Sequence, residues 1–219
     1  MLTFSFLKYT LAEIETELKK RLPYAYRWGI KQNDDWDNYT NFIYDYLEWK
    51  AVVTAMKATS EAYNLDKREL FNYAANRWFN FWSAVAVEQI FTEVDGITPA
   101  LNSKNRLVDF NLFGINFDHK TSKFPKGFKQ TFYYAQRHEE ELLYWLYKNQ
   151  SQQQRKHLGN RLFIIVHAES GEHWKLKAEI SWLKQVILKY VATFDASTLK
   201  KLEFDHQKSA LAAIIWAHK

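Results

Sequence analysis

The sequence contains no cysteine, and it has only three prolines and six glycines among 219 residues. Without cysteine there can be neither disulfides nor thiolate metal sites, so a metal ion must rely on oxygen or imidazole ligands. The seven histidines are scattered, and no HExxH pair places two imidazoles on one helical face. Because glycine and proline are scarce, no flexible linker divides the chain.

Long apolar runs are missing as well. Charged residues interrupt the hydrophobic residues throughout, so no stretch approaches the roughly 18 apolar residues that a membrane span requires. The first ten residues, MLTFSFLKYT, lack the basic segment and the cleavage site of a secretory signal. No glycine-rich nucleotide-binding motif and no GxSxG nucleophile motif is present. We therefore expect a cytoplasmic protein with no membrane partner.

The charge balance favours a polyanionic partner. The formal net charge is +5 and the pI is about 9.1, which suits nucleic acid, although charge alone shifts the odds only modestly. Aromatic residues are dense, with nine tryptophans, thirteen tyrosines and sixteen phenylalanines. Exposed rings could stack on bases, but we expect most of them to fill the core.

Helical patterns occupy the N-terminal third. Thr10 and Glu13 form a capping box that begins a helix, and this helix is expected to end before Pro23. Further helices are predicted from Trp36 to Tyr63 and, after a second capping box at Asp66–Glu69, up to about Val94.

The pattern then changes to that of a sheet. Three short β-like runs follow between Ile97 and Thr121, namely ITPAL, RLVDFNLF and INFDHKT. A helical stretch is predicted from Lys129 to Gln154, then RLFIIVHA as a buried strand, HWKLKAE as a short strand, EISWLKQVILKYVATF as a helix and SALAAIIWAHK as a final helix. We expect an α/β (α+β) protein in which residues 1–66 form a helical extension packed on a core of residues 67–219.

A predicted short hairpin brings together the residues that are the best candidates for catalysis or metal binding. If Phe113 and Gly114 form a two-residue turn, the antiparallel register places Asp109 opposite Asp118. Carboxylates about 5 Å apart repel each other and destabilise a sheet unless a cation offsets the repulsion. This register requires Phe113 to adopt the positive φ of a type I′ turn.

Lys120 joins these carboxylates because side chains alternate along a strand. Asn116, Asp118 and Lys120 share one face of INFDHKT. An ammonium group there can orient a water molecule or stabilise charge on a phosphoryl group, and a divalent ion can lower the pKa of that water. The alternative is that these are solvated charges at strand ends, which is the commoner meaning of an isolated D…DxK string.

The context of this string resembles the PD-(D/E)XK nuclease superfamily. Val108-Asp109 stands where the family has Pro-Asp, and Asp118-His119-Lys120 stands where it has acid-x-Lys. Glu88 lies in the preceding helix, in AVAVEQIF. The resemblance spans about Phe71 to Ala168 and implies a restriction-endonuclease-like core of helix, three-stranded meander, helix and strand.

The resemblance also implies roles for these residues. Asp109 and Asp118 are the expected ligands of Mg²⁺, with Mn²⁺ as a substitute, and the backbone carbonyl of His119 is an additional one. Lys120 is the expected catalytic lysine. Glu88 is expected to help hold the metal, although Glu93 on the same helix competes for this role.

A further element resembles the RecB-like branch of the superfamily. Gln130 and Tyr134 match its Gln-x-x-x-Tyr pattern, and on a helix they would share one face and serve the active site. In a chain so rich in tyrosine, chance explains the match equally well.

A cationic loop precedes this element. Lys123, Lys126 and Lys129 recur every third residue near Pro125 and are candidates for phosphate contacts, with Arg137 as a weaker one. A solvated surface loop is an equally good reading of the same residues.

These observations together predict a Mg²⁺-dependent nuclease that acts on DNA in restriction, repair, or a phage or mobile-element function. The helices before Phe71 and after Ser181 are assigned to substrate selection or to the formation of a homodimer. One alternative is a nuclease fold that binds nucleic acid or protein without cleaving. Another is a helical adaptor, which predicts no strands between Ile97 and Thr121.

Overall fold

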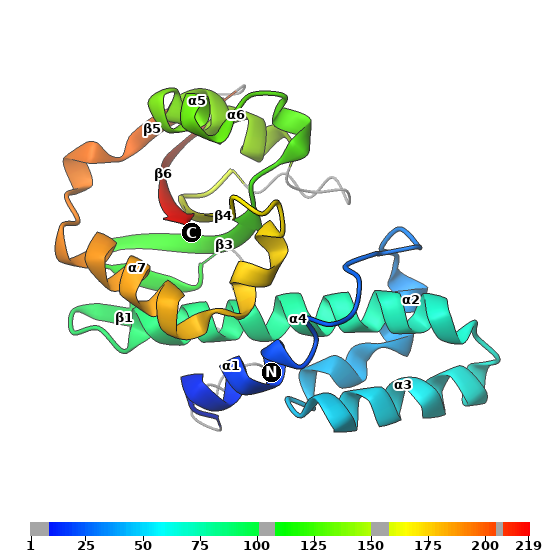
Figure 1. Ribbon diagram of the computed structural model, residues 1–219. Coiled ribbons are helices and arrows are strands. Elements are labelled where there is room, and N and C mark those ends of the chain that lie inside the picture. The colour runs from blue at the N-terminus through cyan, green and yellow to red at the C-terminus, as the bar shows by residue number, and fades with distance from the viewer. Residues whose placement is uncertain (1–8, 101–107, 150–157, 205–207) are drawn as a thin grey trace.

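A six-stranded mixed sheet lies at the centre of the protein (Figure 1). The computed structural model describes residues 9–100, 108–149, 158–204 and 208–219. The first three strands in the chain form an antiparallel meander. The fourth and sixth strands follow in the sheet and run parallel to the third, and the fifth strand lies at the far edge, antiparallel to the sixth. In sheet order the strands are β1 (Ile97–Pro99), β2 (Phe110–Leu112), β3 (Ile115–Lys123), β4 (Arg161–His167), β6 (Lys208–His218) and β5 (Lys200–Phe204).

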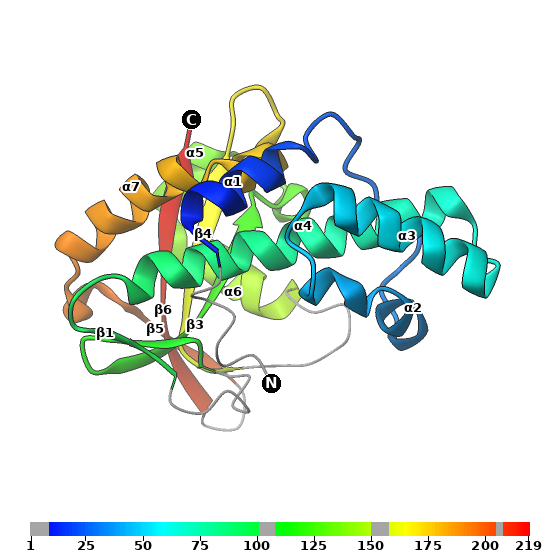
Figure 2. The ribbon, with the colours of Figure 1, turned by 90° about the horizontal axis from the view of Figure 1, so that it is seen from below.

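Helices cover both faces of this sheet (Figures 1 and 2). Alternate side chains of β4 divide between two apolar clusters: Leu162 and Ile164 belong to one, and Phe163 and Ile165 to the other. Burial on both faces explains why β4 is apolar almost throughout. The first cluster contains α1 (Leu11–Lys19), α4 (Lys67–Thr92) and α7 (Ile180–Ala192), and the second contains α5 (Phe132–Arg137) and α6 (Glu139–Asn149).

Capping residues begin α1 and α4 where the sequence predicts. The backbone N–H of Glu13 donates to the Thr10 hydroxyl at 3.2 Å, and the backbone N–H of Thr10 donates to the Glu13 carboxylate at 2.7 Å. The Asp66 carboxylate likewise accepts from the backbone N–H of Glu69 at 2.8 Å. Leu18 of α1 and Trp78 of α4 are buried in the same apolar cluster, so the N-terminal helices pack on the core. The expected division into a helical extension of residues 1–66 and a core of residues 67–219 stays a prediction.

The helix expected from Trp36 to Tyr63 is broken, and that prediction is wrong. It is replaced by α2 (Asp34–Tyr39), a 3₁₀ turn η1 (Asn41–Tyr44) and α3 (Trp49–Tyr63). The Thr40 hydroxyl donates to the carbonyl of Trp36 at 2.6 Å, and the Arg77 guanidinium donates to the carbonyl of Asp37 at 2.7 Å. These contacts take carbonyls at the end of α2, where a continuing helix would need them. Both α2 and α3 lie beside the N-terminal half of α4, beyond the sheet (Figures 1 and 2).

Two predictions in the C-terminal part are also wrong. The run SALAAIIWAHK is not a helix but lies in β6, because it is inserted between β4 and β5 and buried from both sides. The run HWKLKAE forms the 3₁₀ segment η3 (His173–Ala178) rather than a strand. The edge strand β5, which follows the short turn η4 (Ala196–Thr198), has no counterpart in the sequence-based expectation.

The helical stretch expected from Lys129 to Gln154 is divided. A 3₁₀ turn, η2 (Lys126–Phe128), precedes α5, and α6 begins after an interruption at His138. The predicted end of this stretch, residues 150–154, lies outside the described residues. Within the ranges that the structure describes, none of the helices combines the length and apolar character needed to cross a bilayer.

Candidate active site

The hairpin between β2 and β3 has the predicted register. Leu112 faces Ile115 across a two-residue turn in which Phe113 has φ 46° and Gly114 has φ 96°. Both values are positive, as a type I′ turn requires. Beyond β2 the register changes, because the backbone N–H of Asp109 donates at 2.8 Å to the carbonyl of Phe117, which is already the partner of Phe110. Asp109 and Asp118 nevertheless lie close together, since each affects the pKa of the other.

Asp109 is held by the residue that follows Asp118. One of its carboxylate oxygens, Oδ2, accepts from the backbone N–H of His119 and contacts the ring Nδ1 of His119, both at 2.8 Å. Burial acts to raise the pKa of Asp109, but the hydrogen bond and charge of His119 outweigh it and keep that pKa below its ordinary value. The His119 ring packs near Phe110 and Phe91, and its pKa is raised by Asp109 against the opposing effect of burial.

Asp118 has a cationic partner on the next strand. The parallel register of β3 and β4 pairs Asp118 with Arg161, and the two side chains form an ion pair. Burial raises the pKa of Asp118, Arg161 opposes this rise, and the nearby charge of Asp109 adds to it. The sequence did not point to Arg161, because the register between two strands separated by α5 and α6 is not encoded locally.

Glu88 is the acid of α4 that lies near the two aspartates. Burial raises the pKa of Glu88 to about 7; the charge of His119 opposes the rise, and those of Asp109 and Asp118 add to it. Glu93 instead forms an ion pair with Lys184 of α7, with 2.8 Å between nitrogen and oxygen. Of the two acids considered from the sequence, the structure therefore brings Glu88 to the aspartates.

The chemistry of this cluster suits a hard divalent cation, since three carboxylates supply the oxygen ligands that Mg²⁺ prefers. Burial is the main cause of the raised pKa values of Glu88 and Asp118, and repulsion between the carboxylates adds to it; a bound cation would relieve that repulsion. The side chains are nevertheless engaged elsewhere, Asp109 with His119 and Asp118 with Arg161. In the described parts of the chain, no three acidic or histidine side chains already form a metal-binding group.

Lys120 lies at an open edge of the sheet. Since β2 pairs only as far as Phe117, β3 continues from there with β4 on one side and, among the described residues, no strand on the other. A cavity of about 620 Å³ occupies this edge and is lined by Lys120, Thr121 and Lys123. Burial and the charge of Arg161 lower the pKa of Lys120, and Asp118 partly offsets this.

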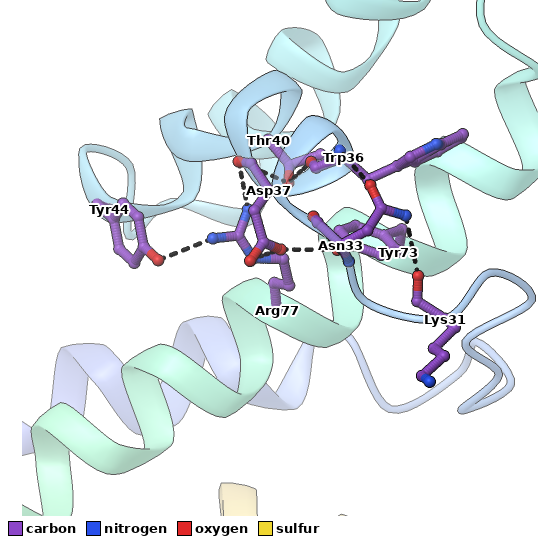
Figure 3. A network of polar contacts seen from close by, with 8 residues as sticks. All are labelled: Lys31, Asn33, Trp36, Asp37, Thr40, Tyr44, Tyr73 and Arg77. Atoms are coloured by element: carbon purple, nitrogen blue, oxygen red, sulfur yellow. Dashed lines mark hydrogen bonds and ion pairs between the residues drawn. The ribbon is translucent and has the colours of Figure 1, made fainter. Parts of the chain in front are cut away.

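Asp37, Tyr44 and Arg77 line this cavity from α2, η1 and α4. They belong to a network of polar contacts that joins these three elements (Figure 3). The Arg77 guanidinium contacts the Asp37 carboxylate at 3.2 Å and donates to the Tyr44 hydroxyl at 2.8 Å. The hydroxyl of Tyr73 donates to the same carboxylate at 2.7 Å (Figure 3). Arg77 is thus buried, and its contacts link α2 and η1 to α4.

Two of the predicted site residues lie elsewhere. Gln130 precedes Thr131, which caps α5, so Gln130 and Tyr134 do not share a helix as expected. The Tyr134 hydroxyl donates to Glu141 at 3.2 Å, and its ring stacks on His138. Neither of the two is among the described residues that line the Lys120 cavity. Their catalytic role stays a prediction.

The predicted phosphate contacts are also distributed unevenly. Lys123 lines the Lys120 cavity, and Lys126 lines a neighbouring cavity together with Lys123. Lys129 is exposed in a left-handed conformation after η2. Arg137 lies at a separate hollow that is lined by the acidic residues Glu139, Glu140 and Glu141. Of these four cations, Lys123 alone lines the cavity beside Lys120, and Lys126 lines the cavity next to it.

Comparisons of the chain with protein-family models, with curated proteins and with solved structures found no significant match.

Proposed function

We propose that this protein is a divalent-metal-dependent nuclease that hydrolyses phosphodiester bonds of DNA. The observation that carries the proposal is the proximity of Asp109 and Asp118, each of which affects the pKa of the other, with Glu88 close enough for its pKa to respond to both. The order of α4, the β1–β3 meander, the α5 and α6 helices and a parallel β4 supports it, because this is the order of a restriction-endonuclease-like core. A homodimer stays a prediction.

In this proposal the carboxylates of Asp109, Asp118 and Glu88 hold Mg²⁺, or Mn²⁺ in its place. When bound, such an ion polarises the phosphate and lowers the pKa of a water molecule. His119 orients the Asp109 carboxylate through its two contacts. Lys120 places its side chain where the charge of Asp118 acts on it, and there it can hold the attacking water or stabilise charge on the phosphoryl oxygens.

A second candidate function is binding of nucleic acid without cleavage. The ion pair between Asp118 and Arg161 favours it, because a guanidinium group already neutralises one of the proposed metal ligands. Cleavage then requires that Asp118 exchange Arg161 for the metal. The two functions share the same surface and differ in that step.

The deciding experiment is a cleavage assay on supercoiled plasmid and on a single-stranded oligonucleotide, in EDTA, Mg²⁺ or Mn²⁺. The wild type is compared with Asp118→Asn and Lys120→Met. Matched controls are Glu203→Gln and Lys201→Met, which change an exposed ion pair on β5 at the opposite edge of the sheet. Thermal unfolding confirms that each variant is folded.

We expect metal-dependent cleavage by the wild type and by both controls. Removing a group that stabilises the transition state typically lowers the rate by about 10²–10³-fold, and this loss is expected for Asp118→Asn and Lys120→Met. DNA binding without cleavage by the wild type in every metal would support the second function and reject the first. Cleavage that survives in both site variants would reject the assignment of the site.

A further inference from the structure

The cavity beside Lys120 is strongly cationic. Its lining includes four basic side chains, namely Lys120, Lys123, Lys177 and Arg77, and a single acidic one, Asp37. Asp37 is already neutralised, because it is paired with Arg77 at 3.2 Å and accepts from the hydroxyl of Tyr73. Among the described residues of the lining there is no second carboxylate, although the charge of Asp118 acts on Lys120 from outside it. A cavity of this kind attracts an anion.

Lys177 is the most unusual member of this set. It lies in η3, is buried, and its ammonium group donates to the side-chain oxygen of Asn80 at 2.6 Å. Among the described residues, no carboxylate forms an ion pair with it, although a buried cation is costly unless it is paired. Burial lowers the pKa of Lys177 to about 7, and the charges of Lys120 and Lys123 contribute. A phosphate group would supply the missing counter-charge.

Two residues of the lining also contain buried polar atoms without a hydrogen-bond partner among the described residues. The hydroxyl of Thr121 and the Nε2 atom of His119 are buried and have no hydrogen-bond partner among the described residues. Both residues belong to β3 and line the same cavity. Buried polar atoms are normally satisfied, so an unsatisfied pair in one cavity indicates a place for a polar ligand.

Aromatic rings complete the lining. Tyr44 from η1, Phe81 from α4 and Trp145 from α6 all border the cavity, and Tyr26 carries the ammonium of Lys123 over its ring at 5.4 Å from the ring centre. Stacking of a base on an aromatic side chain contributes about 1–3 kcal/mol and tolerates any base. A volume of about 620 Å³ lies within the usual range for small-molecule sites.

We propose that this cavity binds one unpaired nucleotide of a single-stranded nucleic acid, with its phosphate on Lys177 and Lys123 and its base against the aromatic rings. A base that enters such a cavity cannot remain paired, so the preferred polymer is a single strand or a strand end. The inference rests on the proposed function only in taking a nucleic acid as the substrate. Because Lys120 lines the same cavity, a nucleotide held there places the adjoining phosphodiester at the candidate active site.

The test measures binding in EDTA, where cleavage is absent. Thymidine 5′-monophosphate, thymidine and inorganic phosphate are titrated separately into the full chain by calorimetry, with intrinsic tryptophan fluorescence as a second readout. The variants are Lys177→Met and Trp145→Leu, and Lys201→Met on β5 is the control. Urea unfolding of every variant shows that it is folded before binding is compared.

We expect the monophosphate to bind at least ten times more tightly than thymidine or inorganic phosphate. Lys177→Met should lose at least tenfold in affinity for the monophosphate, whereas Trp145→Leu should weaken the monophosphate and leave inorganic phosphate unchanged. Equal affinity for thymidine and its monophosphate, or an unchanged affinity in folded Lys177→Met, would overturn the proposal.

A competition experiment separates this inference from the proposed function. A single-stranded oligonucleotide should displace the monophosphate, and a blunt duplex of the same length should do so at least tenfold less well. Nucleotide binding without any metal-dependent cleavage leaves the inference standing and rejects the nuclease. Cleavage without nucleotide binding in this cavity does the reverse.

Discussion

Asp118 on β3 forms an ion pair with Arg161, its neighbour in the parallel register on β4. The guanidinium group therefore neutralises the charge of Asp118, as a metal ion bound to that carboxylate would do in the proposed function. We predict that Arg161→Gln lowers the free energy of unfolding by about 3 kcal/mol at neutral pH, because Asp118 is left buried and uncompensated. Millimolar Mg²⁺ should restore more stability to this variant than it adds to the wild type, as measured by urea unfolding.

The matched control for this prediction is Lys184→Gln, which breaks the more exposed pair with Glu93. An exposed pair contributes about 1 kcal/mol or less, and no response to Mg²⁺ is expected there. Equal stabilisation of the wild type and Arg161→Gln by Mg²⁺ would contradict the idea that the guanidinium and the metal compete for Asp118.

Glu88 makes stability depend on pH. Its pKa is raised from an ordinary value of 4.5 to about 7 in the folded protein. Below pH 4.5 the side chain is protonated in both states, and between these two values only the unfolded chain loses the proton. Stability should therefore fall as the pH rises through this window, by about 3 kcal/mol at most. Urea unfolding of the wild type and of Glu88→Gln, at a series of pH values, measures the difference.

The slope should be smaller in Glu88→Gln, because the amide does not titrate. It should not vanish, since the pKa of Asp118 is also raised by burial and contributes in the same direction. Identical slopes in the wild type and in Glu88→Gln would mean that Glu88 is not held in a desolvated site.

Gly114 allows the turn that aligns the two aspartates. Its φ of 96° is unfavourable for a residue with a Cβ atom, although no atom lies close enough to clash with one. Gly114→Ala should therefore destabilise the protein through backbone strain, by about 1–2 kcal/mol in thermal unfolding. Gly159→Ala is the control, because that position also has open space but no positive φ, and it should be neutral or slightly stabilising.

Arg77 fastens α2 and η1 to α4. It is buried and contacts Asp37, Thr40 and Tyr44 (Figure 3), so Arg77→Met should lower the free energy of unfolding by about 3 kcal/mol. Tyr44→Phe removes a single one of these hydrogen bonds and should cost about 1 kcal/mol. Hydrogen exchange should show the loss of protection in Arg77→Met concentrated in residues 34–44. Uniform loss of protection along the chain would contradict this local role.

The parts of the structure that could be predicted from the sequence depend on local signals. The Thr10 and Asp66 caps and the alternation of INFDHKT act within a few residues, and they correctly locate α1, α4 and the hairpin. The turn and the pairing of β2 with β3 followed from the sequence, whereas the direct opposition of Asp109 and Asp118 lies beyond the paired residues and stays a prediction. The positive φ that this turn requires of Phe113 is unfavourable for a phenylalanine, and the residue adopts it nonetheless, with φ 46°.

The parts that failed depend on distant partners. The alanines and leucine of SALAAIIWAHK favour a helix by intrinsic propensity, but insertion between β4 and β5 overrides that preference. Arg161 and Lys177 lie near the candidate site because they contact residues far away in the chain. Arg161 pairs with Asp118, and Lys177 donates a hydrogen bond to Asn80. No spacing rule in one sequence relates such pairs.

The position of β6 between β4 and β5 determines the order in which the sheet can assemble during synthesis. Of the described strands, β6 leaves the ribosome last, yet β5 has no other partner and β4 gains its second neighbour only from it. Until then one edge of β4, with the apolar run from Leu162 to Val166, is left without a strand beside it. An unpaired apolar edge is prone to aggregation. We therefore expect a nascent chain that stalls before residue 208 to aggregate unless a chaperone binds it.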